Sequence, residues 1–89
     1  MEWDGKRTAV SALGLPRDVL LGDVLVSFVG RYEVNIENYR SILLFTDTLV
    51  KLQAKNCRLL IHGTGLVIEY YTAEELKITG QITSLEFQT

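Results

Sequence analysis

The sequence predicts a small all-β domain, and three observations predict it. Short stretches rich in Val, Ile, Leu and Tyr recur along most of the chain, and several alternate apolar with polar residues, the period of a half-buried strand. Turn residues separate these stretches at nearly regular intervals. The 89 residues are 47% hydrophobic, which is too apolar for a disordered chain and enough for one core. We expect a single domain, with residues 1–22 as an N-terminal lead-in and residues 23–89 as the β region.

The lead-in is the one place where the sequence predicts a short helix. The segment Lys6–Leu13 carries apolar residues on one side, and Gly14 and Pro16 would end a helix there. A helix of about two turns is too short to be stable alone, so it must dock on the sheet or fray. Gly22 marks the break before the β region.

About eight short strands are expected after this break, arranged as a meander of hairpins. The first and third are apolar on both faces, which is typical of strands covered on both sides, whereas the second and fourth alternate. In the last strand the apolar phase shifts between Ile82 and Leu85, which predicts a β-bulge near Thr83–Ser84. The expected strands cover residues 24–29, 32–36, 42–45, 50–54, 58–62, 66–70, 76–78 and 82–87.

Glycines follow several of the apolar stretches and are expected to make the turns. We assign this role to Gly30, Gly63, Gly65 and Gly80, because glycine adopts positive φ without strain. The turn centres fall about 17 residues apart. Two architectures fit this spacing: hairpins folded into a sandwich or small barrel, or a β-solenoid with rungs of about 17 residues. The wholly apolar strands favour the sandwich or barrel, because a one-sided meander would expose them to water.

The chain offers little that points to catalysis or metal binding. His62 is the one histidine, and no second histidine or cysteine is spaced to share a metal with it. Cys57 lies five residues earlier, an offset that places the two side chains on opposite faces of one strand and excludes a dyad there. We therefore expect no enzyme activity, no cofactor and no metal. A hydrolase using His62 with a carboxylate remains as a third hypothesis.

Charge and hydropathy argue against several classes of partner and compartment. The net charge is −2 and the Lys and Arg residues are scattered, whereas nucleic-acid binding needs a basic stripe. No apolar run approaches the roughly 20 residues of a membrane-spanning helix, and the first residues lack the apolar core of a signal peptide. One cysteine fits a reducing compartment. We expect a cytoplasmic protein without direct membrane insertion.

Two aromatic segments are the candidates for binding a protein partner. Each is expected in an exposed turn, and the first combines an aromatic residue with an arginine, types that are enriched at interface hot spots. Ordinary turn chemistry is the alternative interpretation. Open edge strands also present unpaired backbone groups, so a homo-oligomer formed through strand edges is a further expectation. The candidate interaction residues are Glu37, Asn38, Tyr39, Arg40, Tyr70 and Tyr71.

Three stretches, in this order and spacing, carry a family resemblance. They are Leu15-Pro16-Arg17-Asp18-Val19-Leu20-Leu21, FVGRYEVNIENYRSILLFTDT (residues 28–48) and LLIHGTGLVIEYYTAEELKITGQI (residues 59–82). Together they resemble the YabP/YqfC family of sporulation proteins, most closely its YqfC branch. The most specific pieces are the Leu-Pro-x-Asp-Val-Leu-Leu entry, Ile36-Glu37-Asn38, Leu60-Ile61-His62-Gly63 and Glu74-Glu75-Leu76…Gly80.

The resemblance implies a function that composition and spacing do not. It implies a non-enzymatic structural or scaffolding protein of endospore-forming bacteria, made in the mother cell during sporulation. It also implies a membrane-bound sporulation protein as the partner, which would hold this chain in the cytoplasm at the membrane around the forespore. The family has no catalytic residues to carry over. The alternative is a small-ligand or peptide-binding β domain that acts as an adaptor or sensor through the aromatic segments.

Overall fold

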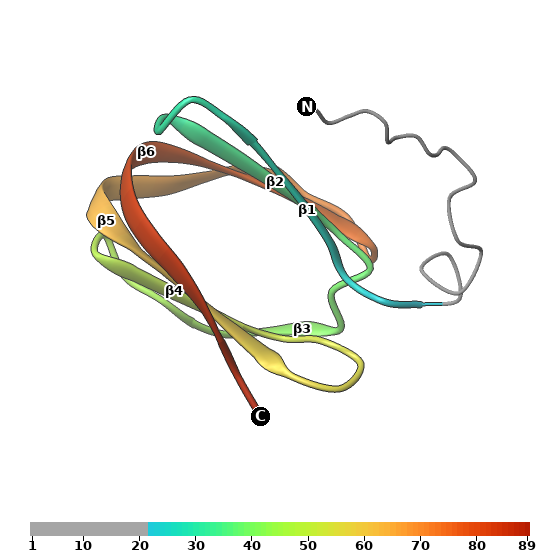
Figure 1. The fold of residues 1–89 in the computed structure, drawn as a ribbon. Coiled ribbons are helices and arrows are strands. Elements are labelled where there is room, and N and C mark those ends of the chain that lie inside the picture. Colours follow the sequence, from blue (N-terminus) through green and yellow to red (C-terminus); the bar gives the residue numbers. More distant parts are fainter. Residues whose placement is uncertain (1–21) are drawn as a thin grey trace, which may run out of the picture.

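The computed structural model describes residues 22–89, and all regular elements in this range are β-strands. They are β1 (Leu25–Val29), β2 (Glu33–Glu37), β3 (Ser41–Phe45), β4 (Leu49–Gln53), β5 (Arg58–Tyr71) and β6 (Glu75–Gln88). The strands form one antiparallel sheet of six strands in the order β1-β2-β6-β5-β4-β3 (Figure 1). The all-β prediction is confirmed, and the helix expected for Lys6–Leu13 lies outside the described residues.

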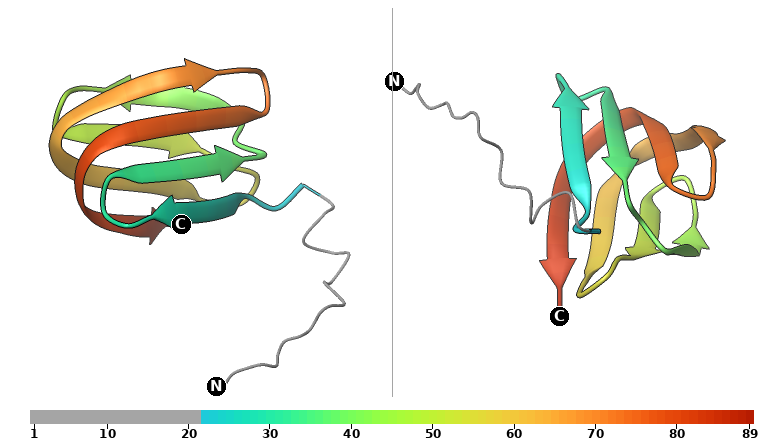
Figure 2. Two further views of the ribbon diagram at one scale, coloured as in Figure 1. Left: turned by 90° about the horizontal axis from the view of Figure 1, so that it is seen from above. Right: turned by 90° about the vertical axis from the view of Figure 1, so that its right-hand side faces the viewer.

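The single sheet folds over on itself, so that it supplies both layers around the core. β5 and β6 are each 14 residues long and curve round one end of the molecule (Figure 2). The first half of β6 pairs with β2, and the first half of β5 pairs with β4. One layer therefore contains β1, β2 and the start of β6, and the other contains β3, β4 and the start of β5. The expected two-layer packing is achieved by one open sheet, with β1 and β3 as its end strands.

The expected number of eight strands is wrong, because two pairs of expected strands are continuous. Residues 58–62 and 66–70 join in β5, and residues 76–78 and 82–87 join in β6. Gly63, Gly65 and Gly80 consequently lie inside strands, at the bends, and not in turns. Gly30 lies in the β1–β2 turn with a φ of 53°, as the sequence predicts.

The bends require glycine because the two long strands approach closely there. A Cβ atom added at Gly63 would lie 2.3 Å from the carbonyl oxygen of Gln81. At Gly80, where φ is +139°, it would lie 2.7 Å from the carbonyl oxygen of Gly65. A side chain at either position would push the strands apart, so these glycines allow one sheet to turn back over its own face.

The register of β5 against β6 shifts at the same place. His62 lies opposite Ser84, and the next residue of β5, Gly63, lies opposite Ile82, so Thr83 is the extra residue of β6. The bulge predicted near Thr83–Ser84 is confirmed. Its Thr83 hydroxyl donates a hydrogen bond of 3.1 Å to the His62 carbonyl, which ties the bulge to the neighbouring strand. A bulge adds twist and bend to a strand, which suits its position beside the glycines.

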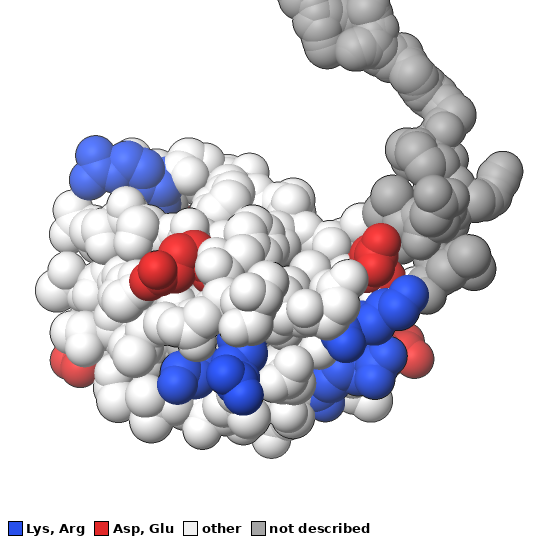
Figure 3. All heavy atoms as spheres, turned by 60° about the horizontal axis from the view of Figure 1, so that its bottom comes forward, with Lys and Arg blue, Asp and Glu red and all other residues white. Residues whose placement is uncertain are grey.

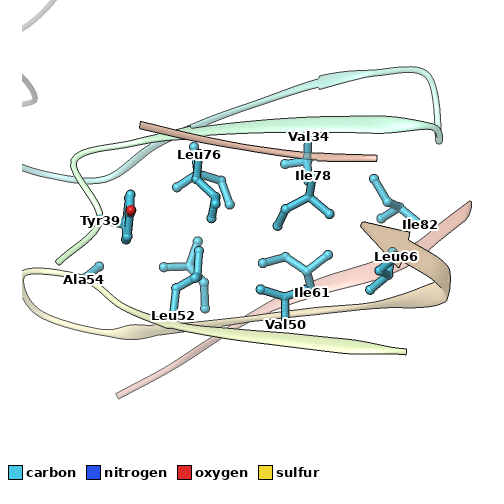
Figure 4. Close-up of a cluster of buried hydrophobic side chains, with 12 residues drawn as sticks. Val34, Tyr39, Val50, Leu52, Ala54, Ile61, Leu66, Leu76, Ile78 and Ile82 are labelled. Carbon is cyan, nitrogen blue, oxygen red and sulfur yellow. The ribbon is translucent and has the colours of Figure 1, made fainter. Parts of the chain in front are cut away.

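The core lies between the two layers (Figure 4). The alternation predicted for the second and fourth strands is confirmed, because their inward residues are fully buried. Leu66 and Ile82 close the core at the bend, and Tyr39 closes it at the opposite end. The facing residues are Val34, Ile36, Leu76 and Ile78 from one layer and Val50, Leu52, Leu59 and Ile61 from the other.

The repeat of about 17 residues does not form a solenoid. It corresponds to two halves with equivalent connections, in which the β1–β2 hairpin attaches to β6 as the β3–β4 hairpin attaches to β5. The backbone N–H groups of Gly80 and Gly63, one at each bend, donate to the hairpin-turn carbonyls of Tyr32 and Thr48, respectively, both at 3.1 Å. The interval of about 17 residues therefore arises from a hairpin-and-strand unit that occurs twice in the fold, and not from stacked rungs.

Candidate protein-interaction site

The two central residues of the segment 37–40 are more buried than the sequence predicts. Tyr39 is only 6% exposed, and its hydroxyl donates a hydrogen bond to the Thr72 carbonyl in the β5–β6 turn. Desolvation by burial, together with the nearby Tyr71, raises the pKa of Tyr39 above its ordinary value of 10.0. Asn38 has a φ of 68°, and its side-chain amide donates to the Asp23 carbonyl at 2.9 Å. Tyr39 and Asn38 therefore hold the fold together, which corrects the expectation of an exposed aromatic turn.

Two other predicted residues, Glu37 and Tyr70, meet on the outer face of the sheet. They line one hollow of about 320 Å³ that spans β1, β2, β6 and β5. The sequence placed them in separate turns, and the crossing of β6 to pair with β2 brings them together. We call this hollow the acidic hollow, and its lining residues are Ser27, Asn35, Ile36, Glu37, Tyr70, Glu75 and Leu76.

The acidic hollow contains two carboxylates of like charge in opposing positions. Glu37 lies directly across from Glu75 in the β2–β6 pair. Side chains opposite each other on an antiparallel pair have Cβ atoms about 4.5–5.5 Å apart, and like charges there are destabilising. Within residues 22–89, neither carboxylate has a hydrogen-bond or ion-pair partner. The hollow therefore carries negative charge that the described part of the chain does not neutralise.

The lysine on this face is directed to a different carboxylate. Lys77 lies opposite Tyr70 in the β5–β6 pair, but its Nζ contacts Glu33 Oε1 at 3.6 Å. Asn35 Nδ2 donates to the other oxygen of Glu33 at 2.8 Å, which holds Glu33 in position for Lys77. This arrangement leaves the Tyr70 ring beside the two remaining carboxylates, a combination that suits a cationic group.

Sequence analysis missed Glu75 because the expected strand begins one residue later, at Leu76. The structure begins β6 at Glu75, and the Thr72 hydroxyl accepts hydrogen bonds from the N–H groups of Glu74 and Glu75, at 3.2 and 3.0 Å. The available signal was the period of two: Glu75, Lys77 and Thr79 alternate with the buried Leu76 and Ile78. That alternation places Glu75 on the outer face of a strand.

Arg40 and Tyr71, the other candidate residues, lie away from the acidic hollow. Arg40 is exposed just before β3, and its backbone N–H donates to the Gln53 carbonyl at 2.7 Å. Tyr71 lies opposite Leu76 at the end of β5 and is exposed. After Arg40, β3 forms an apolar edge in which Leu43, Leu44 and Phe45 are each almost half exposed. The sequence did not predict this exposure, because it expected both faces of the strand to be covered.

His62 lies on an exposed face of the sheet with a carboxylate beside it. Its Nε2 is 3.1 Å from Glu86 Oε1, and the two side chains are 39% and 58% exposed. The hydrolase hypothesis requires such a pair to lie in a cleft, and this one lies in the open. Among residues 22–89, no group of three or more His, Cys, Asp and Glu is arranged to hold a metal ion.

The face formed by β3, β4 and the neighbouring halves of β5 and β6 has a mixed charge. Figure 3 shows its Lys and Arg side chains in separate groups, with acidic side chains between them. In the described range, no helix has the length and apolar character needed to cross a membrane.

Comparison with known proteins places this fold in a family. Residues 23–89, which include all six strands, match the YabP family. The chain belongs to the YabP family. It is 34% identical over 76 residues to YqfC of Bacillus subtilis (strain 168), an alignment that covers 85% of this chain and 82% of that relative. No solved structure matches the chain.

The match to the YabP family begins where the β region begins. It covers both edge strands, β1 and β3, and every residue that lines the acidic hollow. The resemblance inferred from the sequence is therefore confirmed at the level of the family, and the features on which a function can be based all lie within the matched part of this YabP-family chain.

Proposed function

We propose that this YabP-family protein is a non-enzymatic scaffolding protein of endospore formation that binds a membrane-bound sporulation protein. It would act in the cytoplasm of the mother cell, held at the forespore membrane by that partner. Membership of the YabP family supports the cellular process, through the resemblance of the sequence to sporulation proteins. The observation that carries the binding function is the acidic hollow, with its opposed carboxylates and exposed tyrosine.

The hollow fits a Lys or Arg side chain of the partner. A cation between Glu37 and Glu75 would replace their repulsion with attraction, and the face of Tyr70 would add a cation–π contact. Arginine fits best, because its planar guanidinium binds carboxylates with two parallel hydrogen bonds and stacks on aromatic rings. The pair of like charges lowers the stability of the free protein. Such a loss is typical of binding sites, because the residues that favour binding differ from those that favour folding.

The test of this site combines a binding measurement with a stability measurement. The variants Glu75→Gln and Tyr70→Ala are compared with wild type for capture of a membrane-bound partner from solubilised membranes of sporulating cells. We expect each variant to bind about tenfold more weakly, the loss of one charge-assisted or cation–π contact. At the same time Glu75→Gln should raise the free energy of unfolding by about 0.2–1 kcal/mol, because it removes a like-charge pair.

The matched control is Glu74→Gln, the same change one residue earlier in the β5–β6 turn and outside the hollow. It should leave both binding and stability unchanged. Equal capture by Glu75→Gln and wild type would remove the hollow from the binding surface, whatever the effect on stability.

The cellular role is tested by deletion of the gene. We expect the deletion to lower the yield of heat-resistant spores while vegetative growth is unaffected. Complementation with Glu74→Gln should restore spores, and complementation with Tyr70→Ala should not. A deletion strain with normal spore counts would reject a role in endospore formation.

The exposed β3 edge supports a second candidate, a peptide-binding adaptor. An extended peptide would add a strand to β3 and contact Leu43, Leu44 and Phe45. Leu44→Lys tests it, because a lysine on an edge strand opposes strand addition. Loss of partner capture in Leu44→Lys with normal capture in Glu75→Gln would favour the adaptor, and the reverse result would favour the acidic hollow.

A further inference from the structure

β1 is an edge strand without the features that normally protect such an edge. All five of its residues, Leu25–Val29, are uncharged, and all five pair in unbroken register with β2 on one side. Within residues 22–89 no strand pairs with its other side. Natural edge strands are usually blocked by lysine, proline, a bulge or a covering element. Among residues 22–89, nothing therefore blocks the pairing of this edge with another strand.

Two apolar side chains of β1 are exposed, and one of them lies on the core side of the sheet. Phe28 lies opposite Val34, which is fully buried, so Phe28 points to the core side of the sheet, and yet it is 50% exposed. Val29, on the outer side, is 56% exposed. A hollow of about 210 Å³ lies next to Phe28, and its lining residues are Phe28, Gly30, Arg31, Ile82, Thr83, Ser84 and Leu85. The core is therefore open at this edge.

The hydrogen bond of the β1–β2 turn shows which backbone groups of β1 face the open edge of the sheet. The Val29 carbonyl accepts a hydrogen bond of 3.2 Å from the Tyr32 N–H, so the main-chain groups of Val29 point towards β2. These groups alternate in direction along an antiparallel strand. Those of Val26 and Phe28 therefore point to the open edge, ready to bond to another strand.

The sequence around β1 is complementary to itself when it is read in the opposite direction. We propose that two copies of this chain form a dimer by antiparallel pairing of their β1 strands, centred on Ser27. Val26 then lies opposite Phe28 of the second copy, and Leu25 lies opposite Val29. These are apolar pairs on both faces of the sheet, and aromatic–β-branched pairs are among the favourable ones.

Charge complementarity identifies a second copy as the occupant of this edge. Asp23 precedes β1 and Arg31 follows it in the β1–β2 turn, so antiparallel pairing brings the Asp23 end of one copy beside the Arg31 end of the second copy, and the two-fold axis repeats this at the other end. Asp23 is 41% exposed at its one ion-pair contact, with Lys55 at 3.8 Å, so its carboxylate is accessible from outside. No like charges meet in this register. The two-fold axis is perpendicular to the sheet, which keeps the two outer faces on one side of a continuous sheet.

The β3 edge does not offer the same arrangement. A bulge between Ile42 and Leu44 interrupts its register with β4. Antiparallel self-pairing centred on Leu43 would place Arg40 opposite Thr46 and would therefore form no ion pair. The dimer therefore uses β1 and leaves β3 on the surface of each copy, and the acidic hollow stays on the outer face with Ser27 at its border to the second copy.

Charge reversal with rescue tests the register of the dimer. Sedimentation of the full chain over a range of concentrations should show a monomer–dimer equilibrium. Arg31→Asp and Asp23→Arg should each weaken dimerisation about tenfold, because attraction at two places becomes repulsion. The variant with both changes should recover to within about threefold of wild type. The control Asp47→Arg, in the other hairpin turn, should have no effect.

A wild-type protein that stays monomeric at every concentration would overturn the proposal. So would a dimer that Arg31→Asp and Asp23→Arg leave unchanged, since another surface would then form it.

Disulfide trapping provides an independent test. In a Cys57→Ser background, Ser27→Cys should form a covalent dimer on mild oxidation, because opposed residues of a non-hydrogen-bonded pair have Cα atoms about 4.5 Å apart, within disulfide range. The control Asn35→Cys is on the neighbouring strand, opposite Ser27 on the same face, and should cross-link at least about tenfold more slowly. Equal cross-linking rates for the two variants would overturn the β1 register.

Discussion

At the scale of single residues, the same residue type stabilises the fold at one position and is exposed on the surface at another. Tyr39 and Tyr70 are both aromatic residues near a strand end, but Tyr39 is buried and bonded to Thr72 whereas Tyr70 is exposed in the acidic hollow. The difference arises from what lies opposite each ring. The β5–β6 turn covers Tyr39, whereas the described residues leave about half of Tyr70 exposed (48%). A residue type that is enriched at interfaces is therefore no guide to its role until its surroundings are known.

The Tyr39 hydroxyl makes a hydrogen bond whose loss is measurable. Tyr39→Phe keeps the ring in the core and removes the bond to the Thr72 carbonyl. We expect a fall in the free energy of unfolding of about 1 kcal/mol, measured by urea titration. Tyr32→Phe, a matched change at an exposed tyrosine, should cost nothing measurable. Equal stabilities of Tyr39→Phe and wild type would mean that water replaces the bond.

The raised pKa of Tyr39 predicts a dependence of stability on alkaline pH. The folded state holds the phenolic proton more tightly than the unfolded state, whose pKa is near the model value of 10.0. The stability from this group is therefore complete below pH 10 and is lost as the pH rises through the pKa of the folded state. We expect the free energy of unfolding of wild type to fall more steeply with pH in this window than that of Tyr39→Phe. Parallel curves for the two proteins would contradict the shift.

At the scale of elements, the bends of β5 and β6 decide the architecture. Each long strand has a glycine as its sixth residue, Gly63 or Gly80, and at these points the strands pass too closely for a side chain. The bulge at Thr83 adds a residue to β6, and a register shift between Thr64 and Val67 adds one to β5, so both long strands are irregular beside the glycines, where they bend. Without these features the same strands would form a flat sheet with one face exposed.

Substitution of the bend glycines should separate steric crowding from backbone strain. Gly63→Ala places a Cβ 2.3 Å from the Gln81 carbonyl, and Gly80→Ala adds crowding to a positive φ. We expect each to lower the free energy of unfolding by more than about 3 kcal/mol, or to prevent folding. Gly65→Ala has a φ of +63° but open space around the new Cβ, so it should cost about 1–2 kcal/mol. Urea titration that finds Gly65→Ala the most harmful of the three would contradict this account.

At the scale of the whole molecule, one sheet serves as both layers of the core. β5 and β6 belong to both layers, so neither layer has a complete set of strands without the other. The fold therefore behaves as a single unit even though its connections divide into two equivalent halves. In the described part of the chain its remaining openings are at the ends of the sheet, where the outer edges of β1 and β3 pair with no other strand. These are the surfaces through which it would assemble.

This sharing predicts one cooperative unfolding transition. Ile78→Ala in one layer and Ile61→Ala in the other should each lower the free energy of unfolding by about 2–5 kcal/mol, since both side chains are fully buried. The transitions followed by tyrosine fluorescence and by far-ultraviolet circular dichroism should coincide in both variants. Val67→Ala, at an exposed position of β5, should change stability by less than about 0.5 kcal/mol. Separate transitions for the two layers would show that they fold independently.

Most of the candidate site could not be predicted, although two of its residues were identified. The sequence singled out Glu37 and Tyr70 but left Glu75 outside the expected strand, and it had no means of placing the three together. Glu37 and Glu75 meet because β6 pairs with β2 and not only with β5. Local patterns contain no information about that choice, because any antiparallel neighbour satisfies a strand with the same alternation.

By itself, the sequence determined the all-β class, the positions of the buried residues in the second and fourth strands, the bulge near Thr83 and the family, because each depends on a local pattern of residues. Only the tertiary structure decided that eight expected strands are six, that Gly63 and Gly80 bend strands and do not end them, and that Tyr39 is buried. These outcomes depend on what lies across the core from each residue. They follow from the packing of distant segments, which the order of residues along the chain does not display.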